Sequence, residues 1–198
     1  MPLPQGQLFQ ADVPSGFHYC ADFITPDEEI RLAREIEGVS FSTFEMRGVA
    51  ARRRVAFFGA SYDRGPAASP PLPDFLVAVR AKVASWANVE PDAFEMALIN
   101  EYPPGAPIGW HRDAPQYGIV AGISLLSPCR MKFRPYVRPG ARSSTAAPRR
   151  SATHEVLLEP RSAYLMTGDS RNAYEHHIPA VTTLRYSITF RTARAGSS

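Results

Sequence analysis

Side chains that commonly bind iron stand close together in the second half of this sequence. His111 and Asp113 are two residues apart, and a pair of adjacent histidines follows at His176 and His177. Two imidazoles and one carboxylate occupy one face of the metal in non-haem Fe(II) oxygenases and leave the opposite positions open for a co-substrate and O2. The residue types and their order therefore indicate an iron-dependent oxidation.

Arginine supplies the second chemical group. Residues 184–191 alternate between apolar and polar side chains, so on a strand the apolar set faces a core and the polar set faces away from it. The polar members are Arg185, Ser187, Thr189 and Arg191. A guanidinium binds a dicarboxylate through a planar, bidentate pair of hydrogen bonds, so this face predicts a small anionic ligand. Asn100 and Tyr102 share one face of another candidate strand and can add neutral hydrogen bonds to the same acid.

The histidine pair leaves one question open. His176 and His177 are adjacent, so on a strand they face opposite ways and only one of them can bind the metal. Spacing alone does not decide between them.

The elements that must position these groups follow from periodicity. A short strand is expected at 17–23, and a helix starts after Thr25, which can act as the N-cap with Pro26 at the first helical position. A second amphipathic helix is expected at 72–86, and strands around a basic turn at 41–63.

The pattern changes after residue 94 to short alternating segments separated by Pro and Gly. Two helices followed by many short strands predict an α+β, mostly β fold, a double-sheet jelly roll with the helices packed on one sheet. The candidate strands are 95–102, 108–113, 118–126, 130–136, 153–158, 163–167, 175–178 and 184–192.

A chain of 198 residues is long enough for one full domain, which we place at 17–192. Residues 1–16 read as a flexible N-terminal arm and 193–198 as a tail. The stretch 138–152, which contains Pro139-Gly140, several serines and four arginines, reads as a mobile basic loop.

Composition limits the class of protein. The net charge of +3 favours anionic partners, nucleic acid included. Cys20 and Cys129 form no Cys-x-x-Cys pattern, which favours reduced thiols and a cytoplasmic location. We find no signal peptide and no apolar run long enough to cross a membrane, so we expect a soluble monomer without a membrane partner.

Five motifs together resemble the AlkB family of Fe(II)- and 2-oxoglutarate-dependent dioxygenases. They lie at 100–105, 111–113, 166–171, 176–179 and 185–191. The resemblance extends over roughly residues 17–192 and is specific from residue 98 onward. It implies the jelly-roll (double-stranded β-helix) fold and oxidative demethylation of N-alkylated nucleobases in DNA or RNA, as in DNA repair, with release of aldehyde, succinate and CO2.

The resemblance also assigns roles to individual residues. It implies that His111, Asp113 and His176 bind Fe(II), with His177 in the small-residue position that follows the distal ligand. Asn100, Tyr102, Arg185 and Arg191 would then bind 2-oxoglutarate, with Ser187 where the family often has Asn; O2 completes the set of co-substrates.

Substrate contacts are expected from the N-terminal part. Basic residues next to aromatic ones suit phosphate contact and base stacking, and the candidates here are Arg52, Arg53, Phe57, Phe58 and Tyr62. The alternative is that the phenylalanines belong to the core and the arginines to a solvated turn. Repair members often carry a second acid two positions after the ligand Asp, where this chain has Pro115, so their base preference should not be copied.

Two other functions stay open at this point. One is an oxygenase of the same fold that acts on a protein or a small molecule. The other is a non-catalytic nucleic-acid-binding module, against which the intact set of ligands and both arginines argue.

Overall fold

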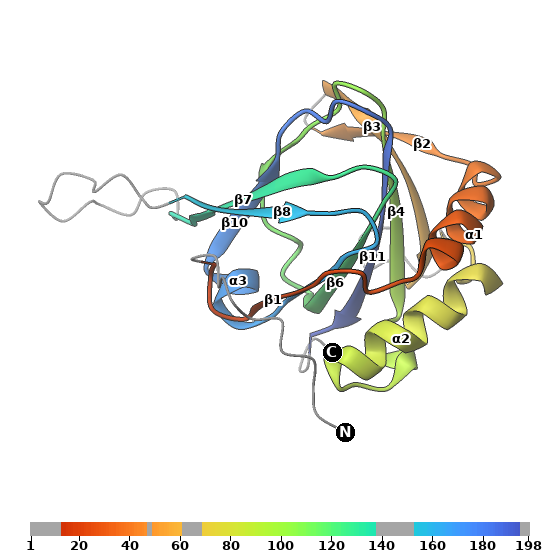
Figure 1. Cartoon of the computed structure of the whole chain (residues 1–198). Coiled ribbons are helices and arrows are strands. Elements are labelled where there is room, and N and C mark those ends of the chain that lie inside the picture. Colours follow the sequence, from red (N-terminus) through yellow and green to blue (C-terminus); the bar gives the residue numbers. More distant parts are fainter. Residues whose placement is uncertain (1–12, 47–48, 61–68, 138–152, 195–198) are drawn as a thin grey trace, which may run out of the picture.

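The computed structural model describes residues 13–46, 49–60, 69–137 and 153–194 (Figure 1). Within this part of the chain the strands form two antiparallel sheets, and the strand order is β1-β9-β6-β11-β4-β3-β2 in the larger sheet and β5-β10-β7-β8 in the smaller. The strands are β1 (Phe17–Cys20), β2 (Ser42–Met46), β3 (Val49–Gly59), β4 (Met96–Tyr102), β5 (Ile108–His111), β6 (Tyr117–Leu125), β7 (Cys129–Pro135), β8 (His154–Leu158), β9 (Ala163–Met166), β10 (Tyr174–Ile178) and β11 (Arg185–Ala193).

The first helix, α1 (Pro26–Glu37), begins where the sequence predicts. The backbone N–H of Glu28 donates to Thr25 Oγ1 at 3.1 Å, and the backbone N–H of Thr25 donates to Glu28 Oε2 at 2.7 Å. This reciprocal pair satisfies two backbone N–H groups that a helix start leaves without partners. Ile30 of this helix is 49% exposed.

The second predicted helix divides into two pieces. Residues 74–76 form a 3-10 turn, η1 (Asp74–Leu76), and α2 (Val77–Ala87) follows. Leu72 and Pro73 stay outside because Pro73 is extended and has no side-chain cap to start a helix there. Another 3-10 turn, η2 (Pro91–Ala93), leads into β4.

Helices α1 and α2 cover one face of the larger sheet, on the right in Figure 1. The main core lies between these two helices and the larger sheet, and it includes Ile36, Val83, Ile99 and Ile188, each fully buried. The apolar residues of β11 point into this core, as the alternation in 184–191 predicts. The predicted mostly β jelly roll with N-terminal helices packed on one sheet is therefore confirmed.

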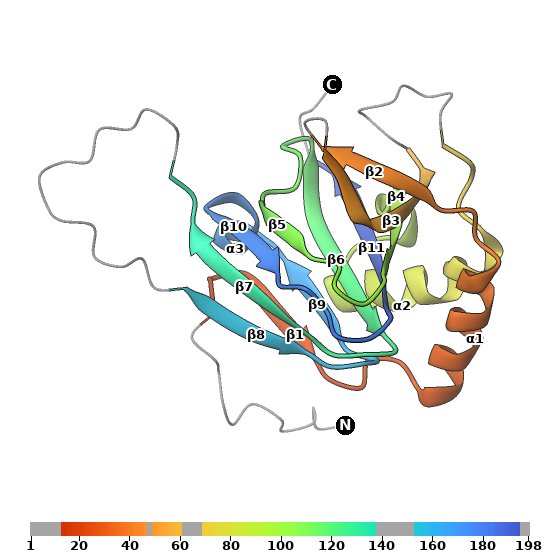
Figure 2. The ribbon, with the colours of Figure 1, turned by 90° about the horizontal axis from the view of Figure 1, so that it is seen from above.

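The opposite face of the larger sheet turns towards the smaller sheet (Figure 2). A second apolar cluster lies there, in which Phe17 stacks on Tyr164 at 5.9 Å and meets Phe133 edge-on at 5.2 Å between ring centroids. Polar side chains of β4 and β11 share this inner face with the cluster, which is where a functional site can form.

The eight strands predicted after residue 94 correspond to β4 to β11, with ends that differ by at most two residues. A five-residue helix, α3 (Gly168–Asn172), was not predicted; at its start the backbone N–H of Thr167 donates to Ser170 Oγ at 3.2 Å. No helix in the described ranges has both the length and the apolar character needed to span a membrane.

The two ends of the chain are partly held in place. Residues 13–16, predicted as part of a flexible arm, are instead bonded: Thr167 N donates to Gly16 O at 2.9 Å, and Ser170 N donates to Ser15 O at 2.8 Å. At the other end Arg194 N donates to Gln116 O at 2.8 Å. The rest of the predicted arm and tail, and the basic loop 138–152, lie outside the described residues.

Candidate active site

Strands β5 and β10 bring two of the predicted ligands together. His111 and His176 are directly paired in the antiparallel register, and their ring centroids are 4.2 Å apart. His177 faces the other side of β10, where its Nδ1 lies 2.7 Å from Ile108 O and its ring is 5.1 Å from that of Trp110. His176, and not its neighbour, is therefore the histidine that shares a face with His111.

Asp113 lies beyond the end of β5, so strand alternation does not fix its direction. Its Oδ1 accepts hydrogen bonds from Arg191 Nε at 2.9 Å and Nη2 at 2.7 Å, while its Oδ2 lies 3.7 Å from His176 Nε2. Arg171 holds the loop from outside, since it donates to the carbonyls of Asp113 at 3.3 Å and Tyr117 at 2.9 Å and also to that of Ala114. The carboxylate is thus directed at the histidines by two arginines.

Burial and neighbouring charges set the protonation states of the three candidate ligands. Burial raises the pKa of the Asp113 carboxyl, but Arg191, His176 and His111 outweigh burial and hold that pKa well below its usual range. Burial lowers the pKa of His176 to about 3 and lowers that of His111 too. At neutral pH the site therefore offers two neutral imidazoles and one carboxylate, the forms in which these side chains bind metals.

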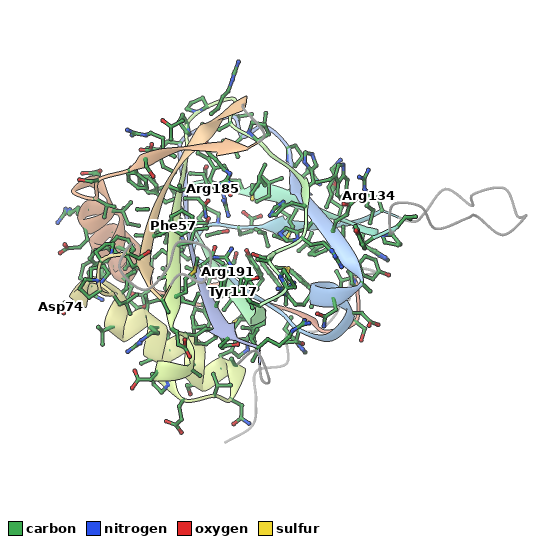
Figure 3. The ribbon with its side chains drawn as sticks, turned by 180° about the vertical axis from the view of Figure 1, so that it is seen from behind. Phe57, Asp74, Tyr117, Arg134, Arg185 and Arg191 are labelled. Atoms are coloured by element: carbon green, nitrogen blue, oxygen red, sulfur yellow. The ribbon has the colours of Figure 1, made fainter. Side chains whose placement is uncertain are left out.

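The residues predicted for iron and for 2-oxoglutarate line one cavity of about 230 Å³ between the sheets. They come from β4, β5 and its following loop, β10 and β11, and Figure 3 shows Arg185 and Arg191 in this interior, with Asp74 at the periphery. The predicted residues that line it are Asn100, Tyr102, His111, Asp113, His176, Arg185, Ser187 and Arg191.

Arg185 is the most informative member of the cavity. Its side chain is 1% exposed; Nη2 donates to Ser124 Oγ at 2.7 Å, and the guanidinium lies 5.1 Å from the centroid of the Tyr102 ring. Its Nε and Nη1 are buried without a hydrogen-bond partner. A buried charge that lacks partners is costly, so these nitrogens indicate the position of an anionic ligand.

Neutral groups line the wall next to Arg185. Asn100 Nδ2 donates to Ser187 Oγ at 3.3 Å, and Asn100 Oδ1 accepts from Arg53 Nη1 at 3.0 Å. The amide is therefore fixed by a serine on β11 and an arginine on β3, which leaves a rigid polar surface towards the cavity.

The predicted substrate residues fall into two groups. Arg53 and Phe57 lie on the inner face of β3 and line the cavity. Phe58 points the other way and packs on the main core, and Arg52 is exposed near Gly105, so the structure does not place these two in the cavity. The alternation of the strand separates neighbours in this way. Tyr62 lies outside the described residues.

Tyr164 and Arg171 are among the residues at the site to which the sequence analysis gave no role. Tyr164 on β9 lines the cavity, and its ring lies across Gly122, where a Cβ would meet Tyr164 Cζ at 2.2 Å. Arg171 received no role although its motif was recognised. Gly122 was the available signal, because a glycine inside an apolar strand often marks a place where another group packs closely against the backbone.

The donor set fits Fe(II) in residue type. Asp113 Oδ1 accepts from Arg191, and its Oδ2 lies 3.7 Å from His176 Nε2. Across the described residues no group of three or more His, Cys, Asp or Glu side chains is placed so that it could hold a metal ion. Iron ligation by His111, Asp113 and His176 therefore remains a proposal that the chemistry of the donors supports.

Comparison with known proteins agrees with this arrangement. The sequence profile of the 2OG-Fe(II) oxygenase superfamily matches residues 16–191. The chain belongs to this superfamily. It is a 2-oxoglutarate-dependent dioxygenase, and its relatives are AlkB-like.

Among curated proteins, this oxygenase is 26% identical over 181 residues to "Alkylated DNA repair protein ALKBH8 homolog" of Arabidopsis thaliana. The aligned region covers 83% of this chain and 51% of the relative. It thus spans about half the length of that protein. It is 25% identical over 174 residues to "Probable RNA/DNA demethylase ALKBH6" of Danio rerio, with 86% of the chain and 72% of the relative covered.

Solved structures support the fold alone. OsALKBH1 superposes with a TM-score of 0.66 at 16% identity and covers 91% of this oxygenase and 99% of its own chain. A prolyl-4-hydroxylase of Pseudomonas putida gives a TM-score of 0.61 at 14% identity, with 91% and 94% covered. The shared architecture therefore does not choose the substrate.

Proposed function

We propose that this oxygenase removes alkyl groups from the nitrogen atoms of nucleobases in DNA or RNA. The observation that carries the proposal is one cavity in which a buried arginine with two unpartnered nitrogens shares the walls with a His, Asp, His cluster. Such a cavity suits a dicarboxylate co-substrate bound beside a metal, with room for part of a third molecule.

Each group of residues has a separate task in this proposal. His111, Asp113 and His176 would hold Fe(II), which together with 2-oxoglutarate and O2 supplies the oxidation. Arg185 would bind the distal carboxylate, because its Nε and Nη1 are buried without a hydrogen-bond partner and each can donate to an anion. Arg191 holds Asp113 in place and keeps it ionised.

The charge of the cavity supports an anionic substrate. Four arginines and one carboxylate line it, and both histidines are neutral at pH 7. A 2-oxoglutarate dianion balances only part of this excess, so the remaining positive charge is available to a phosphodiester chain. The printed names of two relatives, a DNA repair protein and a probable RNA/DNA demethylase, agree with such a substrate.

The wall formed by β3 is the proposed contact for the base. Phe57 offers an aromatic face and Arg53 a cation in the same cavity. A duplex base would have to be turned out of its stack to reach this wall, which costs least for single strands and damaged bases. Pro115 has no carboxylate that could attract the positive charge of a cationic methylated base. The panel of substrates should therefore include neutral methylated bases as well as cationic ones.

The test is reconstitution with Fe(II) and 2-oxoglutarate without oxygen, followed by addition of O2 and a panel of methylated DNA and RNA oligonucleotides. Succinate and formaldehyde are measured together, with Asp113→Ala as the inactive control. Equal yields of both products with one class of oligonucleotide would support the proposal and identify the substrate. Succinate without formaldehyde across the whole panel would refute nucleobase demethylation while keeping the oxygenase.

A further inference from the structure

A second pocket adjoins the cavity behind Asp113. It has a volume of about 450 Å³ and is formed by the loop after β5, by α3 and by the end of β11. Its lining residues are Arg112, Asp113, Pro115, Arg171, Asn172 and Arg194. It shares Arg112 and Asp113 with the cavity, so the two spaces are neighbours.

Three arginines face this pocket without an anion to balance them. Its single carboxylate, Asp113, is bonded to Arg191 and faces the cavity histidines. Pro115 and Asn172 carry no charge. Burial lowers the pKa of Arg171, and the like charges of Arg194 and Arg112 add to that lowering, whereas Asp113 opposes it. The lining residues therefore carry three positive charges against the one carboxylate of Asp113.

Arg171 gives the strongest indication of a ligand. The side chain is only 5% exposed, and its two terminal nitrogens donate to backbone carbonyls of residues 113–117. Its Nε is buried and has no hydrogen-bond partner. Holding the loop explains the two terminal nitrogens but not the third, and a buried N–H without an acceptor is unusual in a native protein.

The other two arginines are pre-positioned. The Arg112 guanidinium lies 3.7 Å from the centroid of the Tyr136 ring and donates to Asn172 O at 3.1 Å. Arg194 donates to Asn172 Oδ1. Both side chains are exposed, yet each is fixed by Asn172 next to the pocket, so less side-chain freedom would be lost when an anion binds.

We propose that this arginine pocket binds a phosphate group of the nucleic acid whose target base occupies the cavity. Arginines match the oxygens of a phosphate, which can accept hydrogen bonds from several directions at once. The contact would fix the backbone beside Asp113 and carry no sequence information. The inference rests on the proposed function for the identity of the ligand, but the pocket itself can be tested without turnover.

The first experiment uses inorganic phosphate alone. The Arg171 Nε–H is buried, so its proton should exchange slowly and give a resolved NMR signal, which Arg171→Lys would assign. Phosphate should shift this signal in a saturable manner, whereas chloride at the same ionic strength should not. An unmoved signal throughout the titration would overturn the proposal.

The second experiment measures binding of a single-stranded oligonucleotide as a function of salt, with neither iron nor 2-oxoglutarate present. Arg194→Gln should weaken binding about tenfold and reduce the slope of log K against log salt by roughly 0.7. Arg31→Gln, an exposed arginine on α1, removes the same charge at a distance and should leave the slope close to that of the wild type.

The two experiments separate the outcomes. Phosphate binding with an unchanged oligonucleotide slope would overturn the assignment to nucleic acid and leave an anion site of another kind. Phosphate binding with a reduced slope would support it. Because neither measurement needs demethylation, a negative product assay would count against the proposed function without counting against the pocket.

Discussion

Replacing Arg185 by methionine should remove the response to 2-oxoglutarate and leave the fold intact. Methionine has a similar length and fills irregular space, and removal of a buried charge is often neutral or stabilising. The loss of the hydrogen bond to Ser124 opposes this gain by about 1–3 kcal/mol. We therefore expect the free energy of unfolding of the ligand-free variant to lie within about 2 kcal/mol of the wild type.

The effect on the ligand should be much larger. Two buried nitrogens of Arg185 have no hydrogen-bond partner, and a hydrogen bond to a charged group contributes about 1.5–3 kcal/mol. Two such bonds correspond to roughly 3–6 kcal/mol, or about 10²–10⁴ in the Kd for 2-oxoglutarate. Arg161→Met is the control, because Arg161 forms ion pairs with Asp22 and Glu29 far from the cavity.

Thermal unfolding in oxygen-free buffer with Fe(II) provides the assay. A ligand at a hundred times its Kd stabilises by about 2.7 kcal/mol, which for a chain of this size raises Tm by roughly 5–11 °C. Wild type and Arg161→Met should show this increase, and Arg185→Met should not. An Arg185→Met protein whose Tm still rises with 2-oxoglutarate would refute the reasoning. A variant that is already unfolded before heating, in the absence of ligand, would refute it as well.

The remaining predictions concern other parts of the molecule. His176→Ala should lose Fe(II) binding, measured by metal content after dialysis, while His177→Ala should retain it, since only His176 faces His111. Gly122→Ala should lower the free energy of unfolding by about 1–3 kcal/mol, because its new Cβ would collide with the Tyr164 ring; adding Tyr164→Leu should restore most of that loss in denaturant titrations. Glu28→Gln should lower Tm by roughly 1–4 °C at pH 7, and this difference should shrink as the pH falls below 4.5. The N–H of Thr25 holds the pKa of Glu28 below its usual value with help from Lys82, so this stabilisation exists above the unfolded pKa and disappears as the pH falls through the folded one.

Three results would contradict these expectations. Iron lost from His177→Ala and kept by His176→Ala would reverse the assignment of the distal ligand. A Tyr164→Leu background that leaves the cost of Gly122→Ala unchanged would locate the collision elsewhere. A Glu28→Gln difference that does not shrink as the pH falls below 4.5 would mean that the carboxylate charge does not stabilise the start of α1.

Much of the fold could be predicted because its signals are local. The capping box at Thr25 and Glu28 fixes the start of α1, and the alternation in 184–191 separates core from cavity on β11. These patterns depend only on residues close together in the sequence, so they can be recognised without knowing the tertiary structure. Helix α3 escaped notice because it has only five residues and little periodicity to detect.

The site could be predicted in part for a similar reason. The identities of the histidines, the aspartate and the arginines are visible in the sequence, but the choice of His176 over His177 needs the register between β5 and β10. The role of Arg171 depends on contacts with carbonyls more than fifty positions away. Phe57 and Phe58 differ only in the face of β3 that each occupies, which the residue types do not reveal.

The pairing of β5 with β10 has a consequence for the lifetime of the protein. β5 has four residues, ends the smaller sheet and meets β10 at two register positions with an irregularity between them. A strand held so weakly should fray before the rest of the sheet. A metal ion bound by His111 and His176 would join the two strands as a cross-link does, so iron starvation would expose this edge to proteases first. Limited proteolysis with and without a chelator would then report metal occupancy as a cleavage rate.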